Sequence, residues 1–228
     1  MKAADAATRE LRFQASPSAG DVSAVLVRPE AAKRLLVFAH GAGAGMRHVF
    51  MDDAARVLAA HGIATFRYQF PYVERGSKRI DPQPILLATV RSAVAAARAA
   101  EPELPLLAGG KSMGGRMTSL AAADEALEGV RGLVFFGFPL HPAGAPSTSR
   151  ADHLARVGVR MLFLQGTRDS LAELDLLRPI LDRLGSHATL HVIEGADHSF
   201  AVPKRTGRSR EDVLEEMAST LESWSEGG

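Results

Sequence analysis

The stretch GGKSMGG (residues 109–115) has the Gly-x-Ser-x-Gly spacing that presents a nucleophilic serine on a sharp strand-to-helix turn. The apolar run LPLLAGG leads into it, and the helical pattern RMTSLAAADEAL follows it. Gly110 and Gly114 occupy the positions where a side chain would collide across such a turn, which leaves the hydroxyl of Ser112 exposed at the apex. The following helix would point backbone N–H groups at developing negative charge. The stretch therefore predicts a serine that attacks acyl groups.

The stretch GGKSMGG is also compatible with two other structural interpretations. GGKS resembles the end of a phosphate-binding P-loop, but that loop needs a glycine five residues before its Gly-Lys-Ser, and Pro105 stands there. By itself, Gly-x-Ser-x-Gly is also compatible with a plain strand-turn-helix junction. The spacing argues against the P-loop, and the choice between the other two depends on partner residues elsewhere in the chain.

A nucleophilic serine needs a general base, and the base needs an acceptor that fixes its tautomer. On a sheet of this kind the acid and then the histidine follow the serine, each just beyond a strand. Asp169 follows the apolar run RMLFLQG, and His198 follows TLHVIEG. A glycine shortly before each residue lets the chain turn sharply toward Ser112. We therefore expect a triad of Ser112, His198 and Asp169.

Other acids and histidines fit this role less well. Asp197 adjoins His198, but neighbouring loop residues rarely aim at each other, so we expect Asp197 to cap its turn. Glu173 and Asp175 fall in the next helical segment and are expected to face water. The remaining histidines do not follow a strand and then a glycine, as His198 does. Helix ends, turns and a strand account for four of them: His48, His61, His187 and His191.

Acyl transfer also requires donors for the oxyanion. One donor is expected to be the backbone N–H of Met113, directly after the nucleophile. The other should come from the loop HGAGAG (40–45), where Ala42 is our first choice and Gly43 the second. The glycines of this loop could also suggest a dinucleotide site or a plain turn, but Gly-x-Gly-x-x-Gly is not matched and no helix opens directly from it.

Two irregular stretches, 71–84 and 139–150, leave the carboxyl ends of strands, where open α/β sheets place their ligands. Phe70, Tyr72 and His141 are candidate pocket residues there, although ordinary packing explains each of them equally well. Gly43, in the loop 40–45, is a fourth candidate pocket residue. No long insertion follows the sixth strand, which favours small or exposed acyl groups over a buried long-chain lipid.

Six nearly continuous apolar runs alternate with helical patterns, as expected for parallel strands covered on both faces. The runs span 34–40, 64–70, 104–110, 132–138, 160–166 and 189–195. Before them, LRFQA and VSAVLVRP flank the turn-rich SPSAGD and predict an antiparallel hairpin. We predict an α/β fold: a mostly parallel, doubly wound sheet of about eight strands, with an antiparallel N-terminal edge and helices on both faces.

The composition is that of one globular domain over residues 1–228, with 46% hydrophobic and 23% charged residues. A formal charge of +1 gives no global field for nucleic acid or an anionic membrane. With no secretion signal and no membrane-spanning run, a cytoplasmic protein is expected. The absence of cysteine excludes disulfides, thiolate metal sites and cysteine nucleophiles, and we expect neither a metal nor a cofactor. The basic run KRTGRSR (204–210) is either a solvated loop or an attraction for acidic substrates.

Taken in order, FAHGAGAG, FRYQFPY, GGKSMGGR, GFPLHPAG, QGTRD and ADHSF resemble the α/β-hydrolase superfamily over about residues 34–204. The resemblance is to its small, lid-poor branch, related to dienelactone hydrolases and to the testis-expressed and NSL-complex-subunit hydrolase-like proteins. It implies the α/β-hydrolase fold, with Ser112 as nucleophile, His198 as base and Asp169 as the orienting acid. Dienelactone hydrolases carry cysteine at the nucleophile position, so their substrate is not implied here.

The expected function is that of a serine hydrolase that cleaves a small acyl ester through an acyl-enzyme. An acyltransferase with the same triad is an alternative. A non-catalytic binding or scaffolding protein is another, because some members of the similar branch look like scaffolds within complexes. The expected partner is a small molecule rather than nucleic acid or membrane, and the sequence leaves the oligomeric state open.

Overall fold

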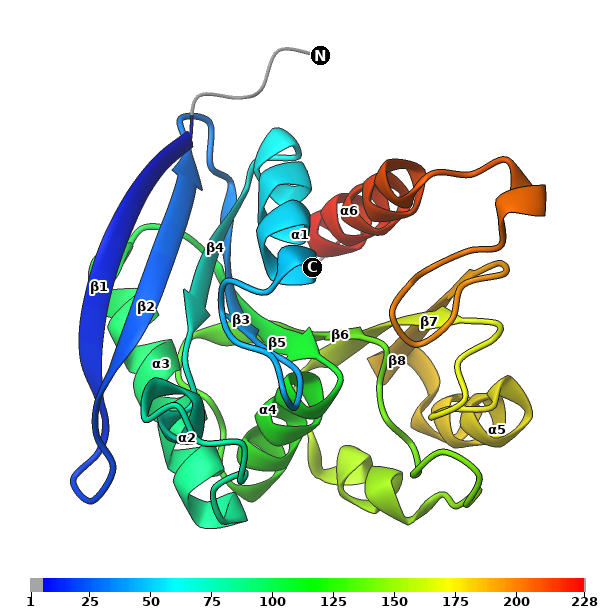
Figure 1. The fold of residues 1–228 in the computed structure, drawn as a ribbon, viewed down its shortest axis with the longest axis horizontal. Coiled ribbons are helices and arrows are strands. Elements are labelled where there is room, and N and C mark those ends of the chain that lie inside the picture. Colours follow the sequence, from blue (N-terminus) through cyan, green and yellow to red (C-terminus); the bar gives the residue numbers. More distant parts are fainter. Residues whose placement is uncertain (1–5, 228) are drawn as a thin grey trace.

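One eight-stranded sheet organises the chain, and the computed structural model describes residues 6–227 of it (Figure 1). The strands are β1 (Ala6–Ser16), β2 (Gly20–Pro29), β3 (Arg34–Ala39), β4 (Ile63–Tyr68), β5 (Leu106–Lys111), β6 (Val130–Phe136), β7 (Arg160–Gly166) and β8 (Ala188–Ile193). The helices are α1 (Val49–Ala60), α2 (Pro71–Glu74), α3 (Gln83–Ala100), α4 (Met113–Asp124), α5 (Leu174–Leu184) and α6 (Arg210–Glu226). Three short 3₁₀ segments complete the order: η1 (Ser149–Arg156), η2 (Gly185–His187) and η3 (Lys204–Thr206).

The strands lie in the order β1-β2-β4-β3-β5-β6-β7-β8. β2 runs antiparallel to both of its neighbours, β1 and β4, whereas the pairs from β4 to β8 are all parallel. The predicted α/β fold with an antiparallel N-terminal edge is therefore confirmed. Because the strands from β3 onward are parallel, their carboxyl ends meet at one edge of the sheet.

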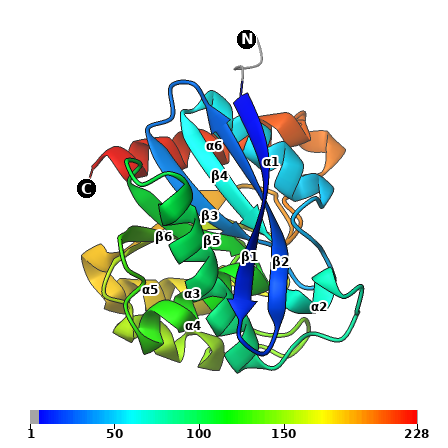
Figure 2. The same cartoon turned by 90° about the vertical axis from the view of Figure 1, so that its left-hand side faces the viewer.

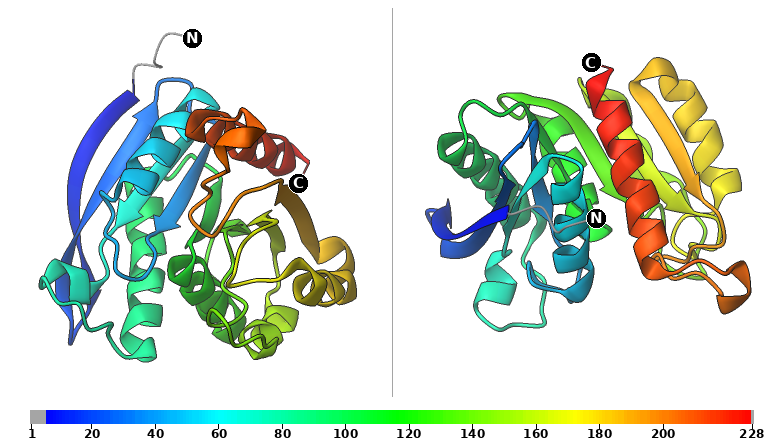
Figure 3. Two further views of the ribbon diagram at one scale, coloured as in Figure 1. Left: turned by 45° about the vertical axis from the view of Figure 1, so that its right-hand side comes forward. Right: turned by 90° about the horizontal axis from the view of Figure 1, so that it is seen from above.

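Helices cover both faces of the sheet (Figures 1 and 2). α1 and α6 pack on one face, in the apolar core that includes Leu36 and Phe38 of β3. α3, α4 and α5 pack on the other, in the core that includes Leu35 and Val37 of the same strand. Successive residues of a strand point to opposite faces, so a continuous apolar run fills both cores. Figure 3 shows α6 lying across the sheet on the side opposite α4 and α5.

The observed elements differ from the expected ones at a few boundaries. β1 (Ala6–Ser16) begins well before LRFQA because its register with β2 continues back to Ala6 opposite Pro29. The irregular stretch 71–84 contains the one-turn helix α2, which Pro71 opens with its preset backbone angle. Within residues 6–227, no helix is both long and apolar enough to cross a bilayer.

Candidate active site

Ser112 lies on the sharp turn that joins β5 to α4. Its backbone has φ 51° and ψ −117°, a conformation that is strained for a residue with a side chain. A Cβ on Gly110 would lie 2.4 Å from the carbonyl oxygen of Ala39, and one on Gly114 would lie 2.5 Å from that of His40. Both glycines are thus required for the turn to pack against the end of β3.

Two hydrogen bonds join Ser112 to His198 and His198 to Asp169. The Ser112 hydroxyl lies 2.8 Å from His198 Nε2, and His198 Nδ1 lies 2.8 Å from Asp169 Oδ2. The carboxylate can only accept, so Nδ1–H donates to Asp169 and leaves Nε2 to accept the serine proton. The Asp169 side chain is 1% exposed, whereas that of His198 is 22% exposed. The imidazole is therefore partly accessible beside the Ser112 hydroxyl, whereas the carboxylate of Asp169 is shielded from water.

The loops that carry Asp169 and His198 meet because Gly166 has no side chain. A Cβ at Gly166, the last residue of β7, would lie 2.2 Å from the carbonyl oxygen of Ala196. Arg168 N–H also donates to that oxygen at 2.9 Å, which ties the two loops together. Gly195 turns the second loop with φ +75°. These two loops and the turn that carries Ser112 all leave the carboxyl ends of their strands, β7, β8 and β5.

Gln165 supports the acid and was not predicted from the sequence. Its Nε2 donates to Asp169 Oδ2 at 2.6 Å, and its Oε1 accepts the N–H of Phe138 at 2.9 Å. The other carboxylate oxygen of Asp169 accepts the N–H of Leu171 at 2.8 Å. Gln165 is fully buried at the end of β7. In the sequence, the feature that could have identified Gln165 is a polar amide at the end of an apolar run, four residues before Asp169.

Lys111 is a second supporting residue that the sequence reasoning missed. It directly precedes Ser112, and its Nζ donates to the carbonyl oxygen of His198 at 2.7 Å. The ammonium also lies 5.3 Å from the ring centroid of Phe200. Burial lowers the pKa of Lys111 to about 8, although the carboxylates of Asp169 and Asp197 act in the opposite direction. In the sequence, the feature that could have identified Lys111 is a charged residue placed between an apolar strand and the serine turn.

The expected oxyanion loop lies beside the serine turn. A Cβ on Gly41 would contact Ser112 Cβ at 3.7 Å, so the start of this loop borders Ser112. Gly43 has φ +70°, and both it and Ala42 are exposed. Met113 is the first residue of α4, where a backbone N–H has no partner within the helix. The assignment of Met113, Ala42 and Gly43 as oxyanion donors stays a prediction.

His40 holds the start of the loop 41–45 in place through two hydrogen bonds. The ring accepts the N–H of Phe70 at Nε2 (3.2 Å), which leaves Nδ1–H to donate to the carbonyl oxygen of Gly41 (2.8 Å). Burial lowers the pKa of His40 to about 4, so the ring is neutral near pH 7 and holds this tautomer. Sequence reasoning passed over His40, although it ends a strand and precedes a glycine.

Gly43 is exposed, whereas the other three candidate pocket residues are covered by protein atoms. Phe70 and His141 are 0% exposed and Tyr72 is 1% exposed. Phe70 stacks on Tyr72 with ring centroids 6.5 Å apart, and both belong to the apolar core. Their role in lining a substrate pocket stays a prediction.

The competing residues have the structural roles expected of them. Asp197 Oδ1 accepts the N–H groups of Ser199 and Ala201, so it caps its own turn. Glu173 and Asp175 are exposed. The other four candidates form local or helix-end contacts: His48 caps α1, His61 ends α1, His187 ends η2 and His191 lies in β8.

The basic run 204–210 combines exposed and paired side chains. Lys204 and Arg205 are exposed, whereas Arg208 pairs with Glu216 and Arg210 pairs with Asp53. Within the described part of the chain, no three histidine, aspartate or glutamate side chains lie together as a group that could hold a metal ion.

A protein-family model described as an alpha/beta hydrolase domain matches residues 32–226. Two relatives from Mycobacterium tuberculosis, strains CDC 1551 and H37Rv, are named phosphoribosyl transferases. Each is 29% identical over 226 residues, which is 97% of this chain and 47% of the relative. The chain therefore spans about half the length of the curated relatives it matches.

Solved structures share the fold over almost the whole chain. A dienelactone hydrolase from Anabaena variabilis has a TM-score of 0.73 at 22% identity, covering 95% of this chain and 96% of its own. A serine hydrolase without a lid from Xanthomonas campestris has a TM-score of 0.73 at 24% identity, covering 95% and 94%. At these identities the likeness establishes the fold.

Proposed function

The chain belongs to the alpha/beta hydrolase domain family, and we propose that it is a serine hydrolase that cleaves a small carboxylic ester through an acyl-enzyme. The observation that carries the proposal is the pair of 2.8 Å hydrogen bonds from Ser112 to His198 and from His198 to Asp169. A serine hydroxyl is a weak nucleophile until an oriented base removes its proton. These two contacts supply the base and its orientation before any substrate binds.

In the first half of the reaction, Ser112 Oγ attacks the ester carbonyl carbon while His198 Nε2 takes its proton. The carbonyl oxygen becomes an oxyanion, and Asp169 stabilises the imidazolium that forms. His198 then gives the proton to the leaving alkoxide, so that an alcohol departs and the acyl group stays on Ser112. In the second half, water loses a proton to His198 and attacks the acyl carbon. The bond to Ser112 breaks, His198 returns the proton to the serine oxygen, and the carboxylic acid is released.

The oxyanion needs backbone donors on the side of Ser112 opposite the base. We assign this role to the N–H of Met113, at the start of α4, and to that of Ala42, in the loop that borders Ser112 through Gly41. Gly43 is the alternative donor in that loop. The start of α4 adds the positive end of a helix dipole at the same place.

The small-ester assignment is supported by the similar lidless serine hydrolase fold and by the connection from β6 to β7, residues 137–159, which contains η1 and no α-helix. Transfer of the acyl group to an acceptor other than water would use the same residues. The name phosphoribosyl transferase describes proteins of which this chain matches 47%, so the proposal depends on the site itself.

A fluorophosphonate probe tests the proposal, because it labels only a serine that is activated as a nucleophile. We expect the wild type and the matched control Ser149→Ala, which changes an exposed serine, to be labelled, and Ser112→Ala to remain unlabelled. Nitrophenyl esters of acetate, butyrate and octanoate then report hydrolysis, with kcat/KM reduced at least about 10³-fold in Ser112→Ala. Equal labelling of wild type and Ser112→Ala would assign the chain to the non-catalytic alternative. Labelling without ester turnover would favour transfer to another acceptor.

A further inference from the structure

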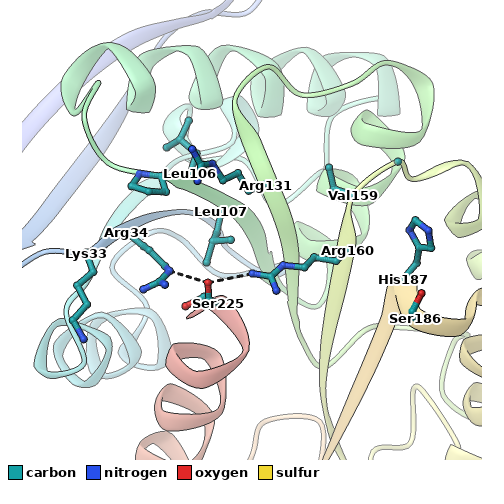
Figure 4. A pocket seen from close by; sticks show the side chains of 12 residues that line it. Lys33, Arg34, Leu106, Leu107, Arg131, Val159, Arg160, Ser186, His187 and Ser225 are labelled. Carbon is teal, nitrogen blue, oxygen red and sulfur yellow. Dashed lines mark hydrogen bonds between the residues drawn. The ribbon is translucent and has the colours of Figure 1, made fainter. Parts of the chain in front are cut away.

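A basic hollow of about 440 Å³ lies at the amino ends of β3, β5, β6 and β7 (Figure 4). Its main polar lining residues are Lys33, Arg34, Arg131, Arg160, His187 and Ser225. Leu106 lines the hollow at the start of β5, whereas Ser112 follows the end of that strand. Six residues of extended chain separate the two by about 20 Å. The basic hollow is therefore distinct from the candidate active site.

The positive charges of the basic hollow are only partly neutralised. Lys33 pairs with Glu222 and Glu226 of α6. Arg34, Arg131 and Arg160 form no ion pair with any carboxylate of residues 6–227. Burial and then the charge of Arg34 lower the pKa of Arg160, and no acid offsets them. Like charges that are gathered without a counter-ion repel each other, and a bound anion would relieve this repulsion.

Two of these arginines are held in place by the end of α6. Arg34 Nε and Arg160 Nη2 each donate to the carbonyl oxygen of Ser225 at 3.2 Å. Figure 4 shows the two guanidinium groups reaching that oxygen from opposite sides. The Arg160 guanidinium also lies over the ring of Trp224, 4.3 Å from its centroid. One hydrogen bond from each arginine leaves its other N–H groups available in a fixed position.

Capping the end of α6 explains Arg34 and Arg160 but does not explain Arg131. Arg131 comes from β6 and is exposed at the rim of the basic hollow, without a hydrogen bond to α6. Arg34, Arg131 and Arg160 line one concavity, and the guanidinium group is the side chain that binds phosphate oxygens in a bidentate manner. The volume of the hollow is in the range of small-molecule sites.

We propose that the basic hollow binds the phosphate or diphosphate group of a small molecule, through Arg34, Arg131 and Arg160. This site goes beyond the proposed hydrolase function and does not depend on it. Binding at the amino edge of the sheet would leave the candidate active site open at the carboxyl edge.

Trp224 is the single tryptophan of the chain and provides a direct readout, because its ring contacts Arg160. Inorganic diphosphate is titrated at constant ionic strength while tryptophan fluorescence is followed, and calorimetry measures the same binding. We expect a saturable change in the wild type. Arg131→Gln should weaken binding about tenfold, since it removes one charged hydrogen-bonding partner. The matched control Arg205→Gln, in the exposed basic run, should bind as the wild type does.

Arg34→Gln is a second variant, checked by circular dichroism because Arg34 also contacts α6; if it does not fold, Arg131→Gln decides alone. The proposal is overturned if chloride or acetate at equal ionic strength produces the same fluorescence change. Unchanged affinity in Arg131→Gln would overturn it as well. Cosedimentation with phosphatidylglycerol vesicles, without binding of free diphosphate, would assign the basic hollow to a lipid headgroup and reject the small-molecule ligand.

Discussion

Lys111 Nζ donates a hydrogen bond of 2.7 Å to the carbonyl oxygen of His198. The residue before Ser112 thus holds the backbone of His198, although the two are 87 positions apart in the chain. Gly137 leaves room for this contact, since a Cβ there would lie 3.2 Å from Lys111 Nζ and 3.5 Å from His198 Cε1. Lys111 is therefore a positioning residue for the serine-histidine pair.

The titration of Lys111 should be visible in the pH dependence of stability. Burial lowers its pKa from the usual 10.5 to about 8 in the folded protein. Between these two values the unfolded chain holds a proton that the folded chain has released, so unfolding takes up a proton. This group therefore makes the free energy of unfolding rise with pH from about 8 to 10.5. Urea denaturation at several pH values measures the free energy of unfolding of wild type and of Lys111→Met. Over this interval the value for wild type should rise relative to the value for Lys111→Met. Parallel curves would contradict the prediction.

The two acids near His198 should differ strongly in their effect on hydrolysis. Asp169→Asn should reduce kcat by about 10⁴-fold, because an amide can donate to Nδ1 and favour the wrong tautomer. Asp197→Asn changes the neighbouring acid, which caps a turn, and should leave kcat within about threefold. Gln165→Leu removes one hydrogen bond to the Asp169 carboxylate and should reduce kcat about tenfold with little change in KM. Steady-state kinetics on a nitrophenyl ester measure all three. An equal loss in Asp197→Asn and Asp169→Asn would refute the assignment of the acid.

The serine turn should tolerate no side chain at Gly114. A Cβ there would lie 2.5 Å from the His40 carbonyl oxygen and 2.6 Å from that of Ala39, and this backbone belongs to the centre of the sheet. Gly114→Ala should therefore destabilise the protein by about 3 kcal/mol. Gly144→Ala is the control, since Gly144 has φ +71° and no atom within 4 Å of the added methyl group. Its expected cost is about 1 kcal/mol, from backbone strain alone. Denaturant titration compares the two, and similar losses would show that crowding at the turn is unimportant.

The fold was largely predictable because buried parallel strands leave continuous apolar runs in the sequence. The apolar run that contains Leu36 and Phe38 contributes side chains to both cores. Such a run can be recognised as a buried strand without knowing which strands lie beside it. The start of β1 was not predictable, because its pairing with β2 continues through polar residues such as Thr8 and Arg9. Backbone hydrogen bonds to a neighbouring strand, rather than hydrophobicity, determine its length.

The sequence by itself determined the order of Ser112, Asp169 and His198, each at the end of a strand, because glycines and apolar runs mark those ends locally. Only the tertiary structure decided which groups support them. Lys111 contacts His198 across 87 positions of the chain, where the absence of a side chain at Gly137 leaves room, and Gln165 joins Asp169 to the N–H of Phe138, 27 positions away. The gathering of Arg34, Arg131 and Arg160 likewise depends on the order of β3, β5, β6 and β7 in the sheet and on the position of α6. Such contacts join distant segments, and no local pattern of residues encodes them.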